Sequence, residues 1–157
     1  MSLLLKITRT SPTHHRLEYT RADGGHESAD IETKSFLQHD FLHYALEVET
    51  GVHTGFFGLL AAGYTLAELG NKVSADFDRD SAMQVERAVG GLTGLIKGAS
   101  PEDVMTGLQN IYNAEGRPLP EWLTADVLER AAERYRRING KWNSLKFGET
   151  LELVFEG

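Results

Sequence analysis

The sequence predicts an α+β fold in which a small antiparallel sheet packs on a cluster of about five helices. Apolar and polar residues alternate in two short runs between residues 3 and 20, which is typical of half-buried strands, and a third, more polar strand is expected up to residue 33. From Gln38 to about Leu145 the apolar residues follow helical spacing, with capping residues and glycines at the breaks. Leu151, Leu153 and Phe155 then alternate again, so a closing strand is expected to join the first three.

The three N-terminal segments predict a meander. Leu3, Leu5 and Ile7 define the first strand, and a second follows over residues 16–20. Asp23-Gly24-Gly25 supplies residues that tolerate the positive φ angles of a tight hairpin, and a more polar third strand follows up to residue 33.

The helical part is expected to begin near Gln38. Gly51 is a candidate C-terminal stop for the first helix, and Thr54 a candidate cap for the second. The second helix, over residues 55–69, contains the most apolar run of the chain, which favours a central buried position.

Three further helices are predicted. Ser81 and Gln84 have the spacing of a capping box for a helix over 81–97. That helix contains glycines four residues apart, which indicate a close crossing with another helix: Gly90, Gly94 and Gly98. Ser100-Pro101 begins the next helix, which ends near Glu115-Gly116. Thr124 caps the last one, whose end is left open by Asn139-Gly140.

Composition narrows the function classes. A chain of 157 residues with 41% hydrophobic and 25% charged residues predicts one globular domain spanning residues 1–157. The net charge of -7 disfavours nucleic acid and anionic membrane as partners. The chain has no cysteine, so any metal must be held by His, Asp or Glu. No apolar run approaches the ~20 residues of a membrane span, and we expect a cytoplasmic protein of bacterial type.

The densest chemistry lies on the first predicted helix. His39 and His43 are four residues apart and therefore share a helix face on which they could hold a divalent metal such as zinc. The spacing is that of the zinc-protease helix signature, with Asp40 in place of its glutamate. Asp40 is the candidate general base, although its side chain is one methylene shorter than glutamate.

Glu47 is a candidate metal ligand, and its alternative role is to orient His43. It lies eight residues from His39, about 12 Å along a helix, so it is better suited to orient His43 than to share its ion. Glu86 and Glu133 on later helices are conceivable further donors. The alternative is that all these side chains form the solvated face of an amphipathic helix, where Glu47 pairs weakly with His43.

Other polar clusters favour structural interpretations. Asp76, Asp78 and Asp80 match the first half of a calcium loop, but Ser81 and Arg87 occupy its glycine and glutamate positions, so we expect loop acids ahead of a helix. The remaining histidines are predicted to be surface residues: His14, His15, His26 and His53. The basic last helix has interleaved glutamates and predicts a salt-bridged face.

The motif H-D-x-x-H-Y-x-x-E at His39–Glu47, the G-F-F-G-L run from Gly55, and the segment W-x-x-L-x-x-G-E-x-L-x-L from Trp142 resemble a group of small uncharacterised bacterial proteins. The resemblance covers about a third of the chain. It implies a single domain and brings no activity, ligand or catalytic residue with it.

Three functions remain open from the sequence. The first is a domain of unknown role with a helix-borne divalent-metal site at His39 and His43. The second is a metal-dependent hydrolase with Asp40 as its base. The third is a non-catalytic structural or protein-interaction module, for which self-association is conceivable. The small-molecule or protein partner is not indicated by the sequence.

Overall fold

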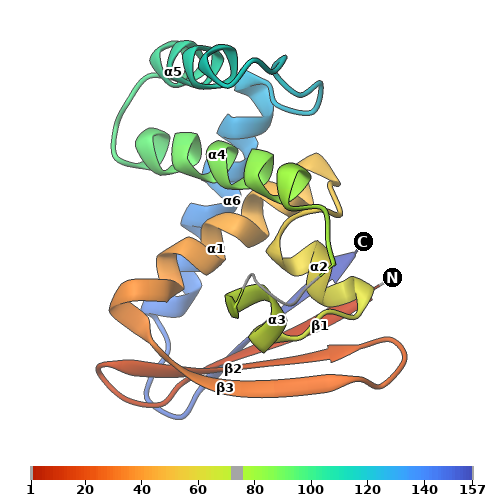
Figure 1. The fold of residues 1–157 in the computed structure, drawn as a ribbon. Helices are drawn as coiled ribbons and strands as arrows, with labels where there is room; N and C mark the ends of the chain where they lie inside the picture. Colours follow the sequence, from red (N-terminus) through yellow and green to blue (C-terminus); the bar gives the residue numbers. More distant parts are fainter. Residues whose placement is uncertain (1, 72–75, 157) are drawn as a thin grey trace.

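The computed structural model describes residues 2–71 and 76–156, and it confirms the α+β fold (Figure 1). Four antiparallel strands form one sheet in the order β3-β2-β1-β4. The strands are β1 (Ser2–Arg9), β2 (His14–Arg21), β3 (His26–Glu32) and β4 (Thr150–Glu156). As expected, the closing strand joins the N-terminal meander, and it does so beside β1.

One face of the sheet forms the base of the core. Leu5 on β1 pairs with Tyr19 on β2 and with Leu153 on β4. Leu5 and Tyr19 are almost fully buried, as are Leu3, Ile7 and Leu17, because successive inward positions alternate with outward ones. The period-two pattern of the sequence therefore selects the face that the helices cover.

The first helix, α1 (Thr33–Thr50), begins five residues before the predicted start at Gln38. Its N-cap is Glu32, the last residue of β3, which makes no side-chain capping hydrogen bond to the backbone. The start therefore has none of the side-chain signals by which a sequence marks a helix N-terminus. Gly51 ends α1 as predicted, with a left-handed φ of 72°.

The predicted helix over 55–69 is two short helices, α2 (Phe56–Ala62) and α3 (Leu66–Asn71). Gly63 separates them with a φ of 117°, a conformation that favours glycine. The N-cap of α2 is Gly55, and the prediction of Thr54 was wrong. The burial predicted for this segment is confirmed at Phe57 and Leu60.

The remaining helices are α4 (Arg79–Ile96), α5 (Pro101–Ala114) and α6 (Ala125–Asn143), which gives six described helices against about five expected. Asp78 caps α4 by accepting from the amides of Asp80 and Ser81, so the predicted capping box was wrong. Ser100 and Thr124 cap α5 and α6 as predicted. The last helix continues through Asn139-Gly140.

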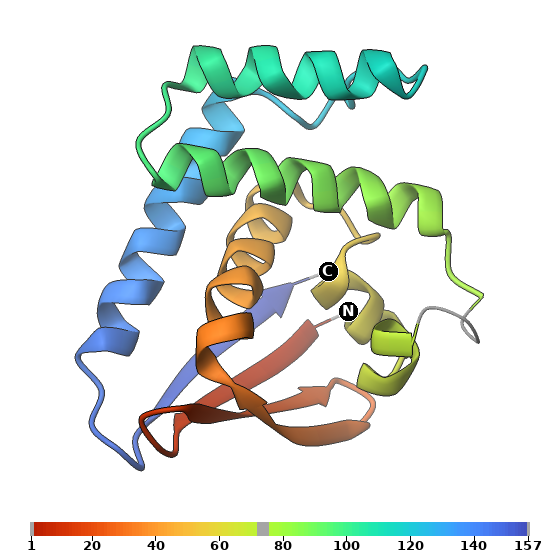
Figure 2. The same cartoon turned by 60° about the vertical axis from the view of Figure 1, so that its left-hand side comes forward.

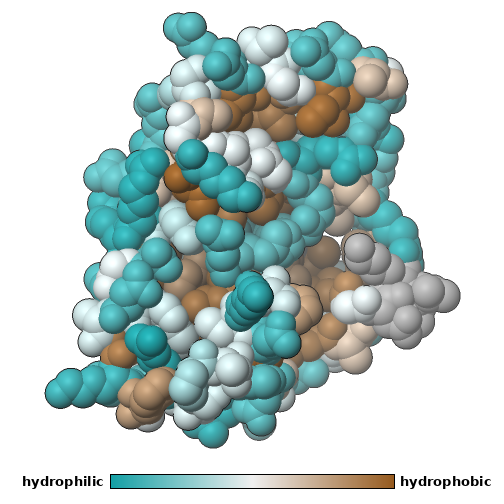
Figure 3. All heavy atoms as spheres, turned by 90° about the vertical axis from the view of Figure 1, so that its left-hand side faces the viewer, coloured by the Kyte–Doolittle hydropathy of each residue, from teal (hydrophilic) through white to brown (hydrophobic). Residues whose placement is uncertain are grey.

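The helices form layers on one face of the sheet (Figures 1 and 2). Figure 2 shows α1 over the sheet with α6 beside it, α4 crossing above α1, and α5 outermost. The close crossing predicted from the glycines occurs one residue away, at Gly91, where a Cβ would lie 2.7 Å from Leu108 of α5. Apolar atoms reach the surface between these upper helices (Figure 3). None of the described helices is long and apolar enough to cross a membrane.

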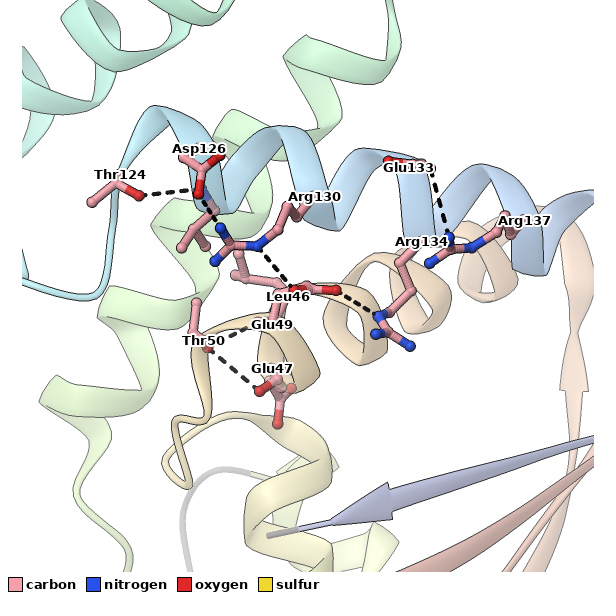
Figure 4. A network of polar contacts seen from close by, with 11 residues as sticks. Leu46, Glu47, Glu49, Thr50, Thr124, Asp126, Arg130, Glu133, Arg134 and Arg137 are labelled. Carbon is pink, nitrogen blue, oxygen red and sulfur yellow. Dashed lines mark hydrogen bonds and ion pairs between the residues drawn. The ribbon is translucent and has the colours of Figure 1, made fainter.

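Ion pairs join α1 to α6 (Figure 4). Glu49 accepts from Arg134 at 2.9 Å and from Arg130 at 3.3 Å, while Arg137 contacts Glu133 at 3.6 Å. These contacts confirm the predicted salt-bridged face of the last helix. Two of its arginines, Arg130 and Arg134, pair with Glu49 of α1.

His15 is buried, which overturns its predicted exposure, whereas His14 is exposed. The alternation of β2 places His15 on the inward face with Leu17 and Tyr19. Its Nδ1 lies 2.9 Å from the Thr33 hydroxyl, and its ring meets Trp142 edge-on. Burial and the neighbouring His14 lower the pKa of His15 to about 4.

Because His15 is buried, the folded protein is expected to lose stability at acid pH. Between pH about 4 and 6.5 the unfolded chain binds a proton at His15 that the folded chain excludes, so stability rises with pH across that window. At about 1.4 kcal/mol per pKa unit, acidification to pH 4 should cost about 2 to 3 kcal/mol through this group. Urea unfolding from pH 4 to 7.5 should show a flatter dependence for His15→Asn than for wild type. His26→Asn, which removes an exposed histidine from β3, should keep the wild-type slope, and parallel curves for all three proteins would contradict the prediction.

Candidate metal centre

His39 and His43 project from α1 toward α4, where Glu86 meets both of them. Nε2 of His39 lies 3.2 Å from Oε2 of Glu86, and Nε2 of His43 lies 2.9 Å from Oε1 of the same carboxylate. The two imidazole rings are 4.6 Å apart between centroids. One ligand atom from each of these three residues lies within 4.8 Å of the other two. The helical spacing thus brings the histidines to one point, and the crossing of α4 over α1 supplies the carboxylate.

The solvated-face interpretation of this part of α1 is wrong for two of its four residues. The side chain of His43 is 2% exposed and that of Glu47 is fully buried. They are covered because α4 and the start of α2 pack on the side of α1 that faces away from the sheet. His39 is exposed and Asp40 is partly buried.

Glu47 holds His43 from the side opposite Glu86. Its Oε2 lies 2.9 Å from Nδ1 of His43, and its Oε1 accepts the Gly58 amide, also at 2.9 Å. Because a carboxylate can only accept, Nδ1 of His43 carries the proton and Nε2 is directed at Glu86. Glu47 is therefore placed as an orienting acceptor and lies outside the group of converging ligand atoms.

Two glycines make room for this buried carboxylate. A Cβ at Gly55 would lie 2.3 Å from Cδ of Glu47, so a side chain there would displace the carboxylate. A Cβ at Gly58 would lie 2.5 Å from the backbone oxygen of His53, which prevents the amide of residue 58 from approaching Glu47 unless that residue is glycine. The glycines of the G-F-F-G-L run thus explain how a charged group is accommodated in the core.

Nε2 of His43 has no aligned hydrogen-bond partner among the described residues, although it is buried. Glu86 lies within ion-pair distance of it, but the contact does not have the geometry of a hydrogen bond. A buried nitrogen at a polar cluster without a directed partner is unusual in proteins and calls for a ligand, an ion or a water.

The electrostatics of the cluster are strongly coupled. Burial alone would lower the pKa of His43, but the hydrogen bond to Glu47 and the nearby Glu86 carboxylate raise it to about 9. Burial would raise the pKa of Glu86, and the two histidines hold it well below its usual range. The charged forms of His43 and Glu86 therefore favour each other.

Asp40 lies beside this group without joining it. Burial raises the pKa of Asp40 to about 6, and the charges of His43 and His39 oppose that rise. Its carboxylate is not among the ligand atoms that converge within 4.8 Å. Its role as a general base stays a prediction.

The other candidate residues are placed elsewhere. Glu133 pairs with Arg137 on α6. His26 begins β3, and His53 lies in the loop before α2; neither belongs to the group of converging ligand atoms. The predicted loop acids have local partners, because Asp76 accepts from the Tyr64 hydroxyl, Asp78 caps α4 and Asp80 pairs with Arg117. Glu86, named in the sequence only as a conceivable donor, is the residue that the fold brings to the histidines.

Comparison with protein families, with curated proteins and with solved structures found no match to this chain. The geometry of the site is therefore what bears on the function of this chain.

Proposed function

We propose that this domain binds one divalent metal ion, with zinc as the best chemical match, through His39, His43 and Glu86. The observation that carries the proposal is the convergence of three ligand atoms within 4.8 Å of one another, one of them the buried Nε2 of His43, for which the described part of the chain offers no aligned partner. Two imidazoles and one carboxylate are a donor set that zinc prefers.

The separations suit a tetrahedral ion. With ligand bonds of about 2.0 Å, neighbouring ligand atoms of a tetrahedron lie about 3.3 Å apart. Nε2 of His39 and Nε2 of His43 lie 3.2 Å and 2.9 Å from different oxygens of Glu86, and one ligand atom from each residue lies within 4.8 Å of the other two, so side-chain shifts would have to bring the three atoms closer around the ion. An ion would replace the proton on Nε2 of His43, while the proton on Nδ1 remains bound to Glu47.

The role proposed for Glu47 follows from its position. An acceptor on the far nitrogen of a metal-binding histidine fixes the tautomer and the ring orientation. Glu47 is itself fixed by the Gly58 amide, so the ring of His43 is held before any ion arrives. This arrangement favours binding because little side-chain freedom remains to be lost.

Three protein ligands leave a fourth position for water or for a ligand, which is the arrangement of catalytic zinc sites. A hydrolase would use that position to lower the pKa of a bound water, and Asp40 is the group proposed to accept its proton. Loss of any hydrolytic activity in Asp40→Asn with zinc binding retained would support this narrower proposal.

A second candidate is a structural charge cluster. His43 lies between Glu47 and Glu86, at 2.9 Å from each, and this triad alone would tie α1 to α4. In that case the protein is a structural or interaction module and binds no stoichiometric metal.

Metal analysis separates the two candidates. Tag-free protein, incubated with zinc, manganese or iron and then desalted, should retain about one zinc per chain by mass spectrometry. His39→Ala/His43→Ala and Glu86→Gln should retain almost none. The matched control is His14→Ala/His26→Ala, which removes two exposed histidines from the sheet and should retain the wild-type amount.

Circular dichroism of each variant shows whether it is folded. Equal metal content in the site variants and the control, or no retained metal in the wild type, would overturn the metal proposal and leave the charge cluster.

A further inference from the structure

A small apolar pocket lies beside the candidate metal centre. Its volume is about 170 Å³, and it lies between α2, α3 and the start of α4. Most of its lining is apolar, with the following principal residues: Phe56, Leu59, Leu69, Phe77, Ala82 and Met83. Among the residues that the structure describes, the charged members of its lining are Arg79 and Glu86.

The pocket and the metal centre share structural parts. Glu86 lines the pocket and also contacts both histidines. Phe56 lines the pocket, and its ring lies 6.2 Å from that of His43. Gly55 lines the pocket as well, and a Cβ added there would lie 2.3 Å from Cδ of Glu47. A molecule in this pocket would therefore have one end beside Glu86, the proposed ligand that the pocket shares with the centre.

The size and lining limit what fits. A cavity of roughly 150 Å³ lined by apolar side chains is known to hold a benzene ring. This pocket is slightly larger, and its apolar wall favours a single ring or a branched chain of similar volume. Arg79, whose guanidinium lies 5.6 Å from the centre of the Phe77 ring, adds a positive charge at the pocket and disfavours a cationic ligand.

We infer that the pocket binds the apolar body of a small acid with one ring or a short branched chain, while its acidic head group completes the coordination of the metal. The inference rests on the proposed metal site and adds the ligand class to it. The oxygen donors of the head group bind at the fourth position of the metal ion. The pocket selects among ligands by the size and apolarity of the rest of the molecule.

Two hydroxamates test the inference, because they carry the same metal-binding group with and without a ring. Calorimetry on protein with its zinc content measured should show benzohydroxamate binding at least about tenfold tighter than acetohydroxamate, since only the first fills the apolar pocket. Ala82→Phe, one helical turn before Glu86, should fill the pocket and abolish the preference while zinc is retained.

Two further variants serve as the control for Ala82→Phe and as its substitute. Ala114→Phe adds the same ring at an exposed position of α5 outside the pocket lining and should leave the preference unchanged. Met83→Ser, at an exposed position of the pocket rim, should reduce the preference severalfold and serves if Ala82→Phe does not fold.

Different results would overturn the pocket inference and the metal site. Stoichiometric zinc with equal binding of both hydroxamates, or a preference unchanged in Ala82→Phe or Met83→Ser, would overturn the pocket inference and leave the metal site standing. A wild type without zinc would overturn the metal site and the pocket inference with it.

Discussion

Replacing Glu47 with alanine should lower the free energy of unfolding by about 3 to 5 kcal/mol, a large effect for one side chain. Glu47 is fully buried, and it accepts from both Nδ1 of His43 and the amide of Gly58. Alanine would leave both donors in the core without an acceptor, and it would leave the charge of His43 with Glu86 alone. Urea unfolding in the presence of a chelator measures the effect without any contribution from bound metal.

Three variants control this experiment. Glu47→Gln keeps one acceptor oxygen and should lose less stability than alanine. His43→Leu/Glu47→Leu removes donor and acceptor together and should also be less destabilised than Glu47→Ala, because no charge is left buried. Glu152→Ala removes an exposed carboxylate 3.9 Å from Lys6 and should stay within about 0.5 kcal/mol of wild type. A loss below about 1 kcal/mol in Glu47→Ala would show that the carboxylate is not held as described.

Gly58→Ala should lower the free energy of unfolding by about 2 to 3 kcal/mol, although alanine is normally the better helix former. The added Cβ would lie 2.5 Å from the oxygen and 2.6 Å from the carbonyl carbon of His53, both of which are backbone atoms. The loop before α2 would have to move, and the Gly58 amide would move away from Glu47. The thermal or urea midpoint of the purified variant measures this loss.

Gly90→Ala is the matched control for that substitution. Gly90 lies within α4, and a Cβ there would meet nothing within 4 Å. Alanine at this position should raise stability by up to about 1 kcal/mol through helix propensity alone. Equal effects of the two substitutions would contradict the packing described around Glu47.

The local signals in the sequence predicted much of the fold. Alternation identified three strands and the Asp23-Gly24-Gly25 turn the remaining one, while Ser100, Thr124 and Gly51 marked helix ends that the structure confirms. These predictions succeeded because each depends on residues close together in the chain. The predicted start of α1 was wrong for the same reason, because Glu32 provides no side-chain cap that a sequence could reveal.

The candidate site could be predicted only in part. The spacing of His39 and His43 placed both rings on one side of a helix, but no local pattern distinguishes the side that water reaches from the side that α4 covers. The contact with Glu86 depends on a helix crossing between residues 47 positions apart in sequence. The burial of Glu47 had one usable signal, the paired glycines at Gly55 and Gly58, which mark a place where the backbone must approach a neighbour closely.

Because β1 lies between β2 and β4, the sheet is complete only after β4 has been synthesised. The hydroxyls of Thr8 and Thr150 are 2.8 Å apart and 142 residues apart in sequence. During synthesis β1 can pair with β2 almost at once, but its other edge stays open until every helix has left the ribosome. The nascent chain must therefore keep an apolar strand edge from mispairing for most of its synthesis, and a chain stopped before β4 would expose that edge to other molecules.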